Sequence, residues 1–173
     1  TDTLLQTAQN LLGIYPDAKF LIPATNDKNM NFIKGRINNN PSKNIKLIKG
    51  KVDEILSSAN IAIAASGTAS LQIALHKKPM IVIYKGSWIS YFIWKMVRLI
   101  PNVSLPNILL NDNFVPEMLQ HRATPNLLSE KACKIINDKE YSKKIESKFN
   151  KLHNDLKRNT SSLIFKIIKP YLK

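Results

Sequence analysis

Short apolar segments that alternate with helical patterns are the feature that most constrains how this chain folds. Apolar runs that are typical of strands occupy residues 19–22, 45–48, 60–65, 80–84 and 103–105. Helical periodicity is found at 4–12, 30–37, 52–58, 68–76 and 87–100, and over most of the chain after residue 115. Strands that are apolar on both faces and alternate with helices indicate a parallel sheet covered on both sides. We therefore predict an α/β fold: a Rossmann-like domain over 1–128 and a helical C-terminal extension over 129–173, packed on that domain or on a partner.

The few cysteines and histidines of the chain limit the kinds of disulfide and metal site that it can form. Cys133 is the only cysteine, so the chain has no intramolecular disulfide framework and no multi-cysteine metal site. Its three histidines are scattered without metal-ligand spacing. We therefore expect no metal and no cofactor, and a reducing, cytoplasmic compartment.

The net charge of +14 raises two kinds of partner, nucleic acid and anionic membrane. Lysine supplies most of this charge, and the chain has only four arginines, which do not cluster. Because base readout and bidentate phosphate binding favour arginine, we expect no nucleic-acid partner. The charge is then mainly that of a solvated, lysine-coated surface.

A Ser66-Gly67-Thr68 turn joins the predicted strand at 60–65 to the helix that follows. Ligands of parallel sheets bind beyond the carboxyl ends of the strands, and a helix N-terminus favours anions. Gly67 allows a ligand to approach the backbone closely. The turn is thus a candidate diphosphate site, and the alternative is an ordinary helix N-cap by Ser66 or Thr68.

Two further segments offer polar groups after the later strands. Asn107 follows Pro106 in a predicted turn, where its amide either reads a base or sugar hydroxyl or bonds its own backbone. Glu117 follows Pro116 at a predicted helix start, where it either bonds a sugar diol or simply complements the helix dipole. For a nucleotide site, we expect the turn at 66–68 and Asn107 to face one cavity.

The segment 87–100 is a predicted helix with a narrow polar stripe and a large apolar remainder. Its apolar stretch is too short to span a bilayer. It is therefore a buried core helix, or an interfacial helix whose membrane contacts are Trp88, Trp94, Lys95 and Arg98. The tail 131–173 is also basic, with a net charge of +8. Its basic face is either solvated or attracted to anionic headgroups.

Several motifs occur in one order along the chain: AASGTASL at 64–71, KPMIVIY at 78–84, VSLPN at 103–107, VPEMLQ at 115–120 and ATP at 123–125. Their order and spacing resemble the carboxyl-terminal half of lipid-A-disaccharide synthase. The resemblance covers most of the chain and is strongest over 61–128. It implies one half of a GT-B fold, in a UDP-dependent, metal-independent inverting glycosyltransferase.

The resemblance also implies substrates and a location. UDP-2,3-diacylglucosamine and 2,3-diacylglucosamine 1-phosphate are the expected substrates, at the cytoplasmic face of the inner membrane. The residues expected to bind the UDP-sugar are Ser66, Gly67 and Thr68 at the diphosphate, Asn107 near the UDP, Glu117 and Gln120 at the nucleotide sugar, and Gln72 at the ribose.

The chain departs from the family pattern at three places. Gln72 stands where the family usually has Glu, and Asn111-Asp112 stands where it has a glycine-arginine pair. The amino-terminal half is absent, including the GSR segment that normally precedes the helix at 4–12. That half carries the acceptor side and the candidate catalytic acids, so we assign no catalytic residue. The alternative function is a non-catalytic remnant or membrane-associated binding module, and exchange of C-terminal helices in a homodimer is left open.

Overall fold

The computed structural model describes residues 1–39, 41–86, 102–157, 164–165 and 167–171. Its α-helices are α1 (Asp2–Ile14), α2 (Asp27–Asn38), α3 (Val52–Ser58), α4 (Thr68–Leu75), α6 (Leu105–Leu110), α7 (Pro125–Asn137) and α8 (Lys139–Leu156). Its strands are β1 (Phe20–Ala24), β2 (Ile45–Lys49), β3 (Ala62–Ala65), β4 (Met80–Tyr84) and β5 (Glu117–Leu119). Short 3-10 turns follow at Gln120–Arg122 and Lys169–Tyr171.

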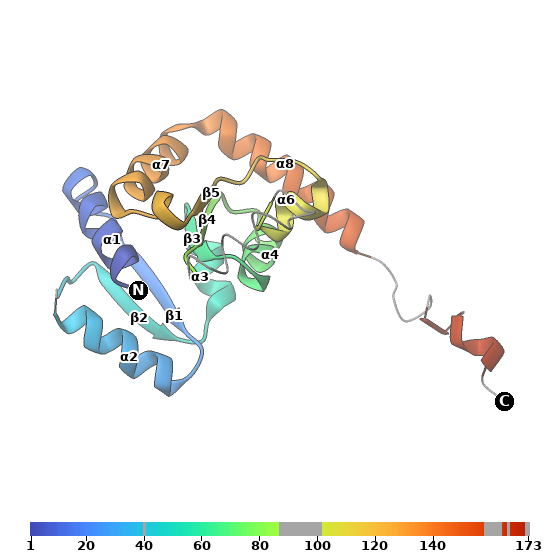
Figure 1. The fold of residues 1–173 in the computed structure, drawn as a ribbon, viewed down its shortest axis with the longest axis horizontal. Helices are drawn as coiled ribbons and strands as arrows, with labels where there is room; N and C mark the ends of the chain where they lie inside the picture. The colour runs from blue at the N-terminus through green and yellow to red at the C-terminus, as the bar shows by residue number, and fades with distance from the viewer. Residues whose placement is uncertain (40, 87–101, 158–163, 166, 172–173) are drawn as a thin grey trace.

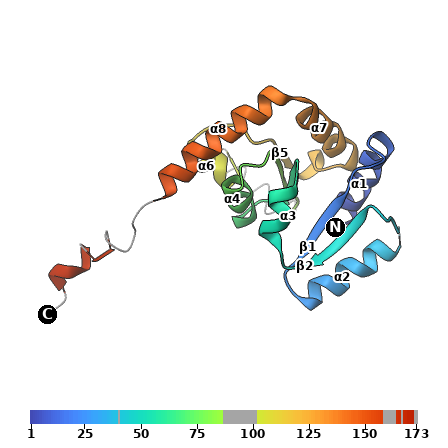
Figure 2. The same cartoon turned by 180° about the vertical axis from the view of Figure 1, so that it is seen from behind.

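All the strand pairs in the described residues are parallel, and they form two separate sheets (Figure 1). One sheet pairs β1 with β2, and the other has the order β3-β4-β5. Figure 2 shows the β1–β2 pair from behind. The predicted α/β class with parallel strands is confirmed.

Several helices pack on the sheets through an apolar face. Leu5, Ala8 and Leu11 are buried on one side of α1, which packs against α7. The helix α2 begins at Asn26, whose side chain accepts a hydrogen bond from the Asn29 amide at 2.8 Å. It contacts β1 and β2 but buries none of its residues fully.

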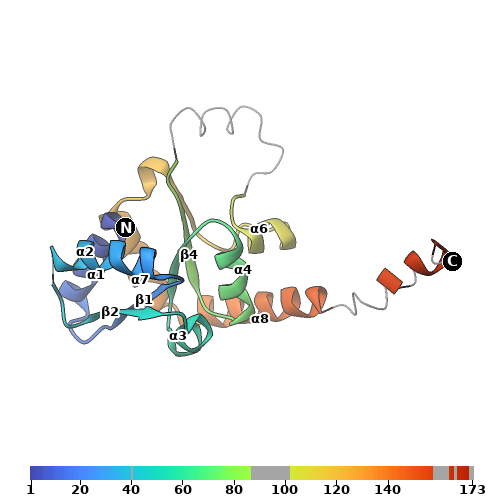
Figure 3. The ribbon, with the colours of Figure 1, turned by 90° about the horizontal axis from the view of Figure 1, so that it is seen from below.

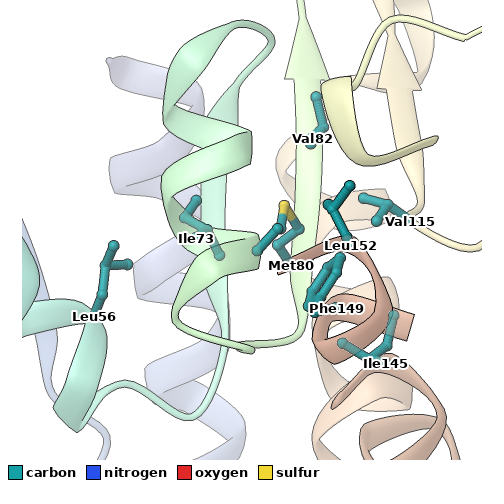
Figure 4. Packing of buried hydrophobic residues seen from close by; sticks show 9 residues of the cluster. Leu56, Ile73, Met80, Val82, Val115, Ile145, Phe149 and Leu152 are labelled. Carbon is teal, nitrogen blue, oxygen red and sulfur yellow. The ribbon is translucent and has the colours of Figure 1, made fainter. Parts of the chain in front are cut away.

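The larger hydrophobic core lies between β4, α4 and α8 (Figure 4). Met80 and Val82 of β4 are fully buried, and Phe149 of α8 packs into the same cluster. The Phe149 ring meets the Phe114 ring edge-on, with 5.5 Å between centroids. Because α8 contributes Phe149 to this core, it stabilises the sheet directly.

The C-terminal region has two parts. The helices α7 and α8 pack on the rest of the molecule, and residue 128, the predicted end of the Rossmann-like domain, lies within α7. The described residues of 164–171 lie well away from the sheets in Figure 3. Their apolar side chains are exposed, with 69% of Ile167 and 83% of Tyr171 accessible.

Two element predictions are wrong, and one lies outside the described residues. Residues 103–105 form no strand, because Leu105 already begins α6. Residues 117–119 form β5 in place of a helix start, because they pair with 82–84 of β4. The predicted helix at 87–100 is not among the described residues. No helix in the described part of the chain has the length and apolar character needed to cross a bilayer.

Candidate functional site

The turn at Ser66-Gly67-Thr68 lies where predicted, between β3 and α4. The Ser66 amide continues the sheet by donating to the Ile83 carbonyl at 2.9 Å. Gly67 has φ of 132° and ψ of −158°, a region that L-residues with a side chain rarely adopt. Among residues 1–39, 41–86 and 102–157, nothing lies within 4 Å of a Cβ built at Gly67, so these residues leave space open beside it. The backbone conformation, and not crowding, therefore requires glycine here.

The N-terminus of α4 is capped by Gly67 without any side-chain hydrogen bond. The expected capping by Ser66 or Thr68 is therefore wrong. Ser66 Oγ donates instead to the Val103 carbonyl at 2.6 Å, and Thr68 is exposed. Helix geometry leaves the first amides without intrahelical acceptors. Among the described residues no acceptor is found for the Thr68 and Ala69 amides.

Gln120 joins the ends of β4 and β5. Its Nε2 donates to the Gly86 carbonyl and its Oε1 accepts from the Gly86 amide, both at 3.1 Å. The side chain is buried and the backbone has φ of 46°. Gln120 thus acts on the backbone just beyond Tyr84, the last residue of β4.

Glu117 is the centre of a dense hydrogen-bond network. Its carboxylate accepts from the amides of Val103 and Ser104 at 3.0 and 2.9 Å. It also accepts from Ser104 Oγ at 2.8 Å and from Asn107 Nδ2 at 2.9 Å. The predicted helix-start environment of Glu117 is wrong, because this residue lies on β5. The carboxylate instead holds the backbone that enters α6.

Asn107 lies inside α6, so the predicted turn at this position is wrong, and its side chain is 1% exposed. Its Oδ1 accepts from the Val115 amide and its Nδ2 donates to the Val115 carbonyl, both at 2.9 Å. With the bond to Glu117, both ends of the amide side chain are engaged. Asn107 therefore fixes the segment around Val115 against α6.

Ser104 belongs to this network and was missed by the sequence reasoning. It is fully buried, and its hydroxyl donates to Glu117. Its place in the VSLPN motif, beside Asn107, is the signal that could have found it. Through the Ser66–Val103 bond and the Glu117 bonds, one chain of contacts connects the turn after β3 with α6 and β5.

The side chain of Gln72 is directed toward α3 and not toward the Glu117 network. Its Nε2 donates to Asp53 Oδ1 of α3 at 3.0 Å, and His76 Nε2 lies 3.0 Å from the same oxygen. The hydrogen bonds from His76 and then Gln72 lower the pKa of the Asp53 carboxyl. The hydrogen bond of Gln72 to Asp53 therefore ties α4 to α3 and does not connect Gln72 with the Glu117 network.

The departure at Asn111-Asp112 has a structural account. Asn111 ends α6 with φ of 48°, a left-handed conformation. Glycine adopts this conformation most easily, and asparagine tolerates it better than most other residues. Asp112 forms an ion pair with Lys148 of α8, and the hydrogen bond from Lys148 is the main cause that lowers the pKa of Asp112. The acidic residue therefore links α6 to α8.

A groove of about 500 Å³ lies beside α7. Its lining includes Asn107, Glu117, Arg122, Lys131 and Lys134 but not residues 66–68. Asn107 is turned into its own network and this groove does not reach residues 66–68, so the cavity expected to be shared by the turn and Asn107 stays a prediction. No cluster of metal-binding side chains occurs in the described ranges. The predicted membrane contacts Trp88, Trp94, Lys95 and Arg98 lie outside those ranges.

The amino-acid sequence of this chain is similar to those of known proteins over nearly its whole length. A family model for lipid-A-disaccharide synthetase matches residues 1–168. Lipid-A-disaccharide synthase of Aromatoleum aromaticum is 34% identical over 98% of this chain and 44% of its own length. The enzymes of Methylobacillus flagellatus and Dechloromonas aromatica are 32% and 35% identical over 99% and 92% of this chain. The chain spans less than half the length of these relatives, 43–46%. The chain belongs to the lipid-A-disaccharide synthetase family and corresponds to the carboxyl-terminal half of its members.

Proposed function

We propose that this chain is the part of a lipid-A-disaccharide synthase that binds UDP-2,3-diacylglucosamine. The sugar would be transferred to 2,3-diacylglucosamine 1-phosphate. Family membership supports the activity class, and the open turn after β3 is the observation that carries the binding role. Gly67 holds that turn in a glycine conformation, and the Thr68 and Ala69 amides have no acceptor among the described residues.

The diphosphate of the nucleotide is the group that suits this turn. The Thr68 and Ala69 amides, for which the described part of the chain has no acceptor, offer donors at a helix N-terminus. The helix dipole favours negative charge there. The exposed Thr68 hydroxyl adds a third donor. In our proposal Gly67 and Thr68 contact the diphosphate directly.

The other predicted site residues have a positioning role in this proposal. Ser66 bonds the Val103 carbonyl, and Glu117 with Asn107 holds the same segment from the other side. Gln120 holds Gly86 beyond β4. These buried amide and carboxylate groups fix the loops that surround the strand ends. Contacts of these four side chains with the nucleotide remain a prediction, as does a ribose contact of Gln72.

The reaction would be a displacement with inversion at the anomeric carbon of the donor sugar. The acceptor 6-hydroxyl oxygen forms the new bond while the bond to the UDP oxygen breaks. The hydroxyl proton passes to a base that we assign to no residue of this chain. Amides preorganised at the turn would stabilise the charge that develops on the departing UDP.

Calorimetric titration with UDP tests the binding role. We expect weak binding, with a Kd near the millimolar range, because the chain spans only 43–46% of the length of the lipid-A-disaccharide synthases to which it is similar. Gly67→Val should reduce the affinity at least about tenfold, because a β-branched residue strains φ of 132°. Asn150→Ala, on the exposed face of α8, should leave the affinity unchanged. Absence of UDP binding at millimolar concentration, with the fold intact by circular dichroism, would contradict the proposal.

The alternative is a non-catalytic remnant or membrane-associated module, and the exposed Ile167 and Tyr171 in the basic segment 131–173 favour the membrane-associated form. Disaccharide formation should be assayed with this chain alone and with the amino-terminal half of the A. aromaticum relative added. Activity of the isolated chain would exclude a remnant. Activity only with the added half would indicate a split enzyme, which we place at the inner membrane surface.

A further inference from the structure

Tyr84 is an aromatic residue at the carboxyl end of β4, the end of a parallel sheet at which ligands bind. It is 40% exposed, whereas Met80, Ile81 and Val82 of the same strand are fully buried. Among the described residues, no hydrogen bond is found for its hydroxyl. The core and the Glu117 network therefore do not account for this side chain.

The face of β4 on which Tyr84 lies follows from the alternation along the strand. Met80 and Val82 pack into the core that includes α4 and α8, whereas Ile81 belongs to the cluster with α1 and α7 (Figure 4). Alternate residues of a strand point to the same face, so Tyr84 lies on the α4 side, beyond Val82. The helix α4 begins with Thr68, directly after the carboxyl end of β3. The tyrosine and the N-terminus of α4 are therefore on the same side of the sheet and at the same end.

The strand register places the turn at 66–68 beside Tyr84. Ala65 of β3 pairs with Ile83 of β4, and the Ser66 amide donates to the Ile83 carbonyl at 2.9 Å. Ser66 is therefore the residue that follows opposite Tyr84, about 4.8 Å away from strand to strand. A group attached to a diphosphate at this turn can reach the tyrosine ring.

The tyrosine ring lies against Gly86. A Cβ built at Gly86 would lie 2.8 Å from the Tyr84 hydroxyl oxygen and 3.1 Å from Cζ, closer than real Cβ atoms approach other atoms. Any side chain at position 86 would therefore displace the ring. Gln120 holds the Gly86 backbone by two hydrogen bonds of 3.1 Å. Glycine at this position leaves room for the ring, and Gln120 fixes the backbone against which the ring lies.

We propose that the Tyr84 ring is the surface against which the hexose of the nucleotide sugar binds, and that Gly86 is glycine to leave the ring in that place. The inference rests on the proposed function, because it takes the diphosphate to bind at the turn after β3. An aromatic ring offers an apolar face to the C–H groups of a sugar, and the tyrosine hydroxyl offers a polar tip. Tyr84 would thus be a binding residue for the donor sugar.

The surroundings of Tyr84 favour the sugar over the uracil base, which the other end of the diphosphate carries. Recognition of a base requires donors and acceptors that are not already engaged. Ser66 Oγ is bonded to the Val103 carbonyl, both ends of the Asn107 amide are bonded, and the Glu117 carboxylate accepts four hydrogen bonds. The face of a sugar ring can pack on an aromatic ring without such groups.

Paired calorimetric titrations with UDP and with UDP-2,3-diacetylglucosamine, a soluble analogue with short acyl groups, test the proposal. We expect the parent protein to bind the sugar nucleotide about fivefold more tightly than UDP, a gain in the range of one aromatic contact. Tyr84→Ala should abolish this gain and leave the Kd for UDP unchanged. Tyr84→Phe keeps the ring and should keep most of the gain.

Gly86→Ala tests the position of the ring without removing it. The atom nearest to the new Cβ is the end of a side chain, which can swing away, so the fold should be kept. The variant should lose the gain as Tyr84→Ala does, and the double variant should bind as Tyr84→Ala alone, because both changes remove one contact. Gly35→Ala in α2, where no atom of the described residues lies within 4 Å of a Cβ, is the matched control and should leave both Kd values unchanged.

The two titrations separate this inference from the proposed function. A parent that binds UDP but gains nothing from the sugar would overturn the inference alone, as would a gain that survives in Tyr84→Ala. A weaker Kd for UDP in Tyr84→Ala, with the sugar gain kept, would place the ring at the uridine or the diphosphate and would overturn it too. Absence of UDP binding by the folded parent would contradict the proposed function itself.

Discussion

At the scale of single residues, the Glu117 carboxylate joins β5 to the segment that enters α6. Four donors converge on its two oxygens, from a segment that lies 10 to 14 positions earlier in the chain. A hydrogen bond to a charged group stabilises a protein by about 1.5–3 kcal/mol, more than a neutral one. The position of Val103 and Ser104, and hence of the start of α6, therefore depends on one ionised side chain.

Glu117→Gln should destabilise the protein by about 2–3 kcal/mol. The new amide group would place a donor against the donors of Val103 and Ser104, which leaves one of them unsatisfied. The free energy of unfolding in urea measures the loss. Glu146→Gln, on the exposed side of α8, is the matched control and should change that free energy by less than about 0.5 kcal/mol. Equal values for the two variants would show that the network contributes nothing to stability.

Asp53 gives the link between α3 and α4 a dependence on pH. Hydrogen bonds from His76 and Gln72 lower the pKa of this carboxyl below its ordinary value of 3.8. Its stabilising contribution is therefore complete above pH 3.8 and is lost as the pH falls through the lower pKa of the folded state. We expect Asp53→Asn to melt at a lower temperature than the parent at pH 7, and the difference to shrink steadily as the pH is lowered below 3.8. A difference that grows on acidification would contradict this sign.

At the scale of elements, α8 belongs to the hydrophobic core although it is far in sequence from the strands that it covers. Ile145, Phe149 and Leu152 share one face through their spacing of three and four residues, and all three are buried. They lie under β4, beside Met80 (Figure 4). The three-stranded sheet therefore has no complete core without this helix.

Phe149→Ala should cost about 3–5 kcal/mol of stability, because it removes a fully buried ring and its contact with Phe114. The shift of the urea midpoint, with an unchanged m-value, measures this loss. Lys151→Ala on the exposed side of α8 should shift the midpoint by no more than about a tenth as much. A small effect of Phe149→Ala would mean that α8 does not form the core described above.

Elements with strong local patterns were predictable from the sequence, and elements defined by distant contacts were not. The strand at 80–84 is a run of apolar residues, and the structure has β4 there. The strand β5 has three residues, and Pro116-Glu117 is typical of a helix start, so only its pairing with β4 reveals it.

The same division holds for the candidate site. The turn at Gly67 was predictable, because a strand, a glycine and a helix follow one another locally. The burial of Asn107 was not, because it depends on Val115 and Glu117, eight and ten residues further along the chain. The split into two sheets was also outside local pattern, since strand pairing is a property of the tertiary fold.

At the scale of the whole molecule, charge and exposed apolar residues coincide in the C-terminal region. The chain carries a net charge of +14, and residues 131–173 contribute +8 of it. Ile164, Phe165, Ile167, Ile168 and Tyr171 are all exposed. Basic residues near a membrane surface are attracted to anionic lipids, and exposed apolar side chains add partition into the interface. The combination favours a peripheral membrane contact.

The chain should therefore cosediment with vesicles that contain about 30% phosphatidylglycerol and not with pure phosphatidylcholine. Raising the salt from about 0.1 to 1 M shortens the screening length from about 10 to 3 Å, so binding should fall at least tenfold. Ile167→Ser combined with Ile168→Ser keeps every charge and should weaken binding severalfold, whereas Thr7→Ser in the buried face of α1 should not. Binding that ignores both salt and lipid charge would mean that the basic tail does not direct this chain to a membrane, because a contact of that kind cannot be indifferent to screening.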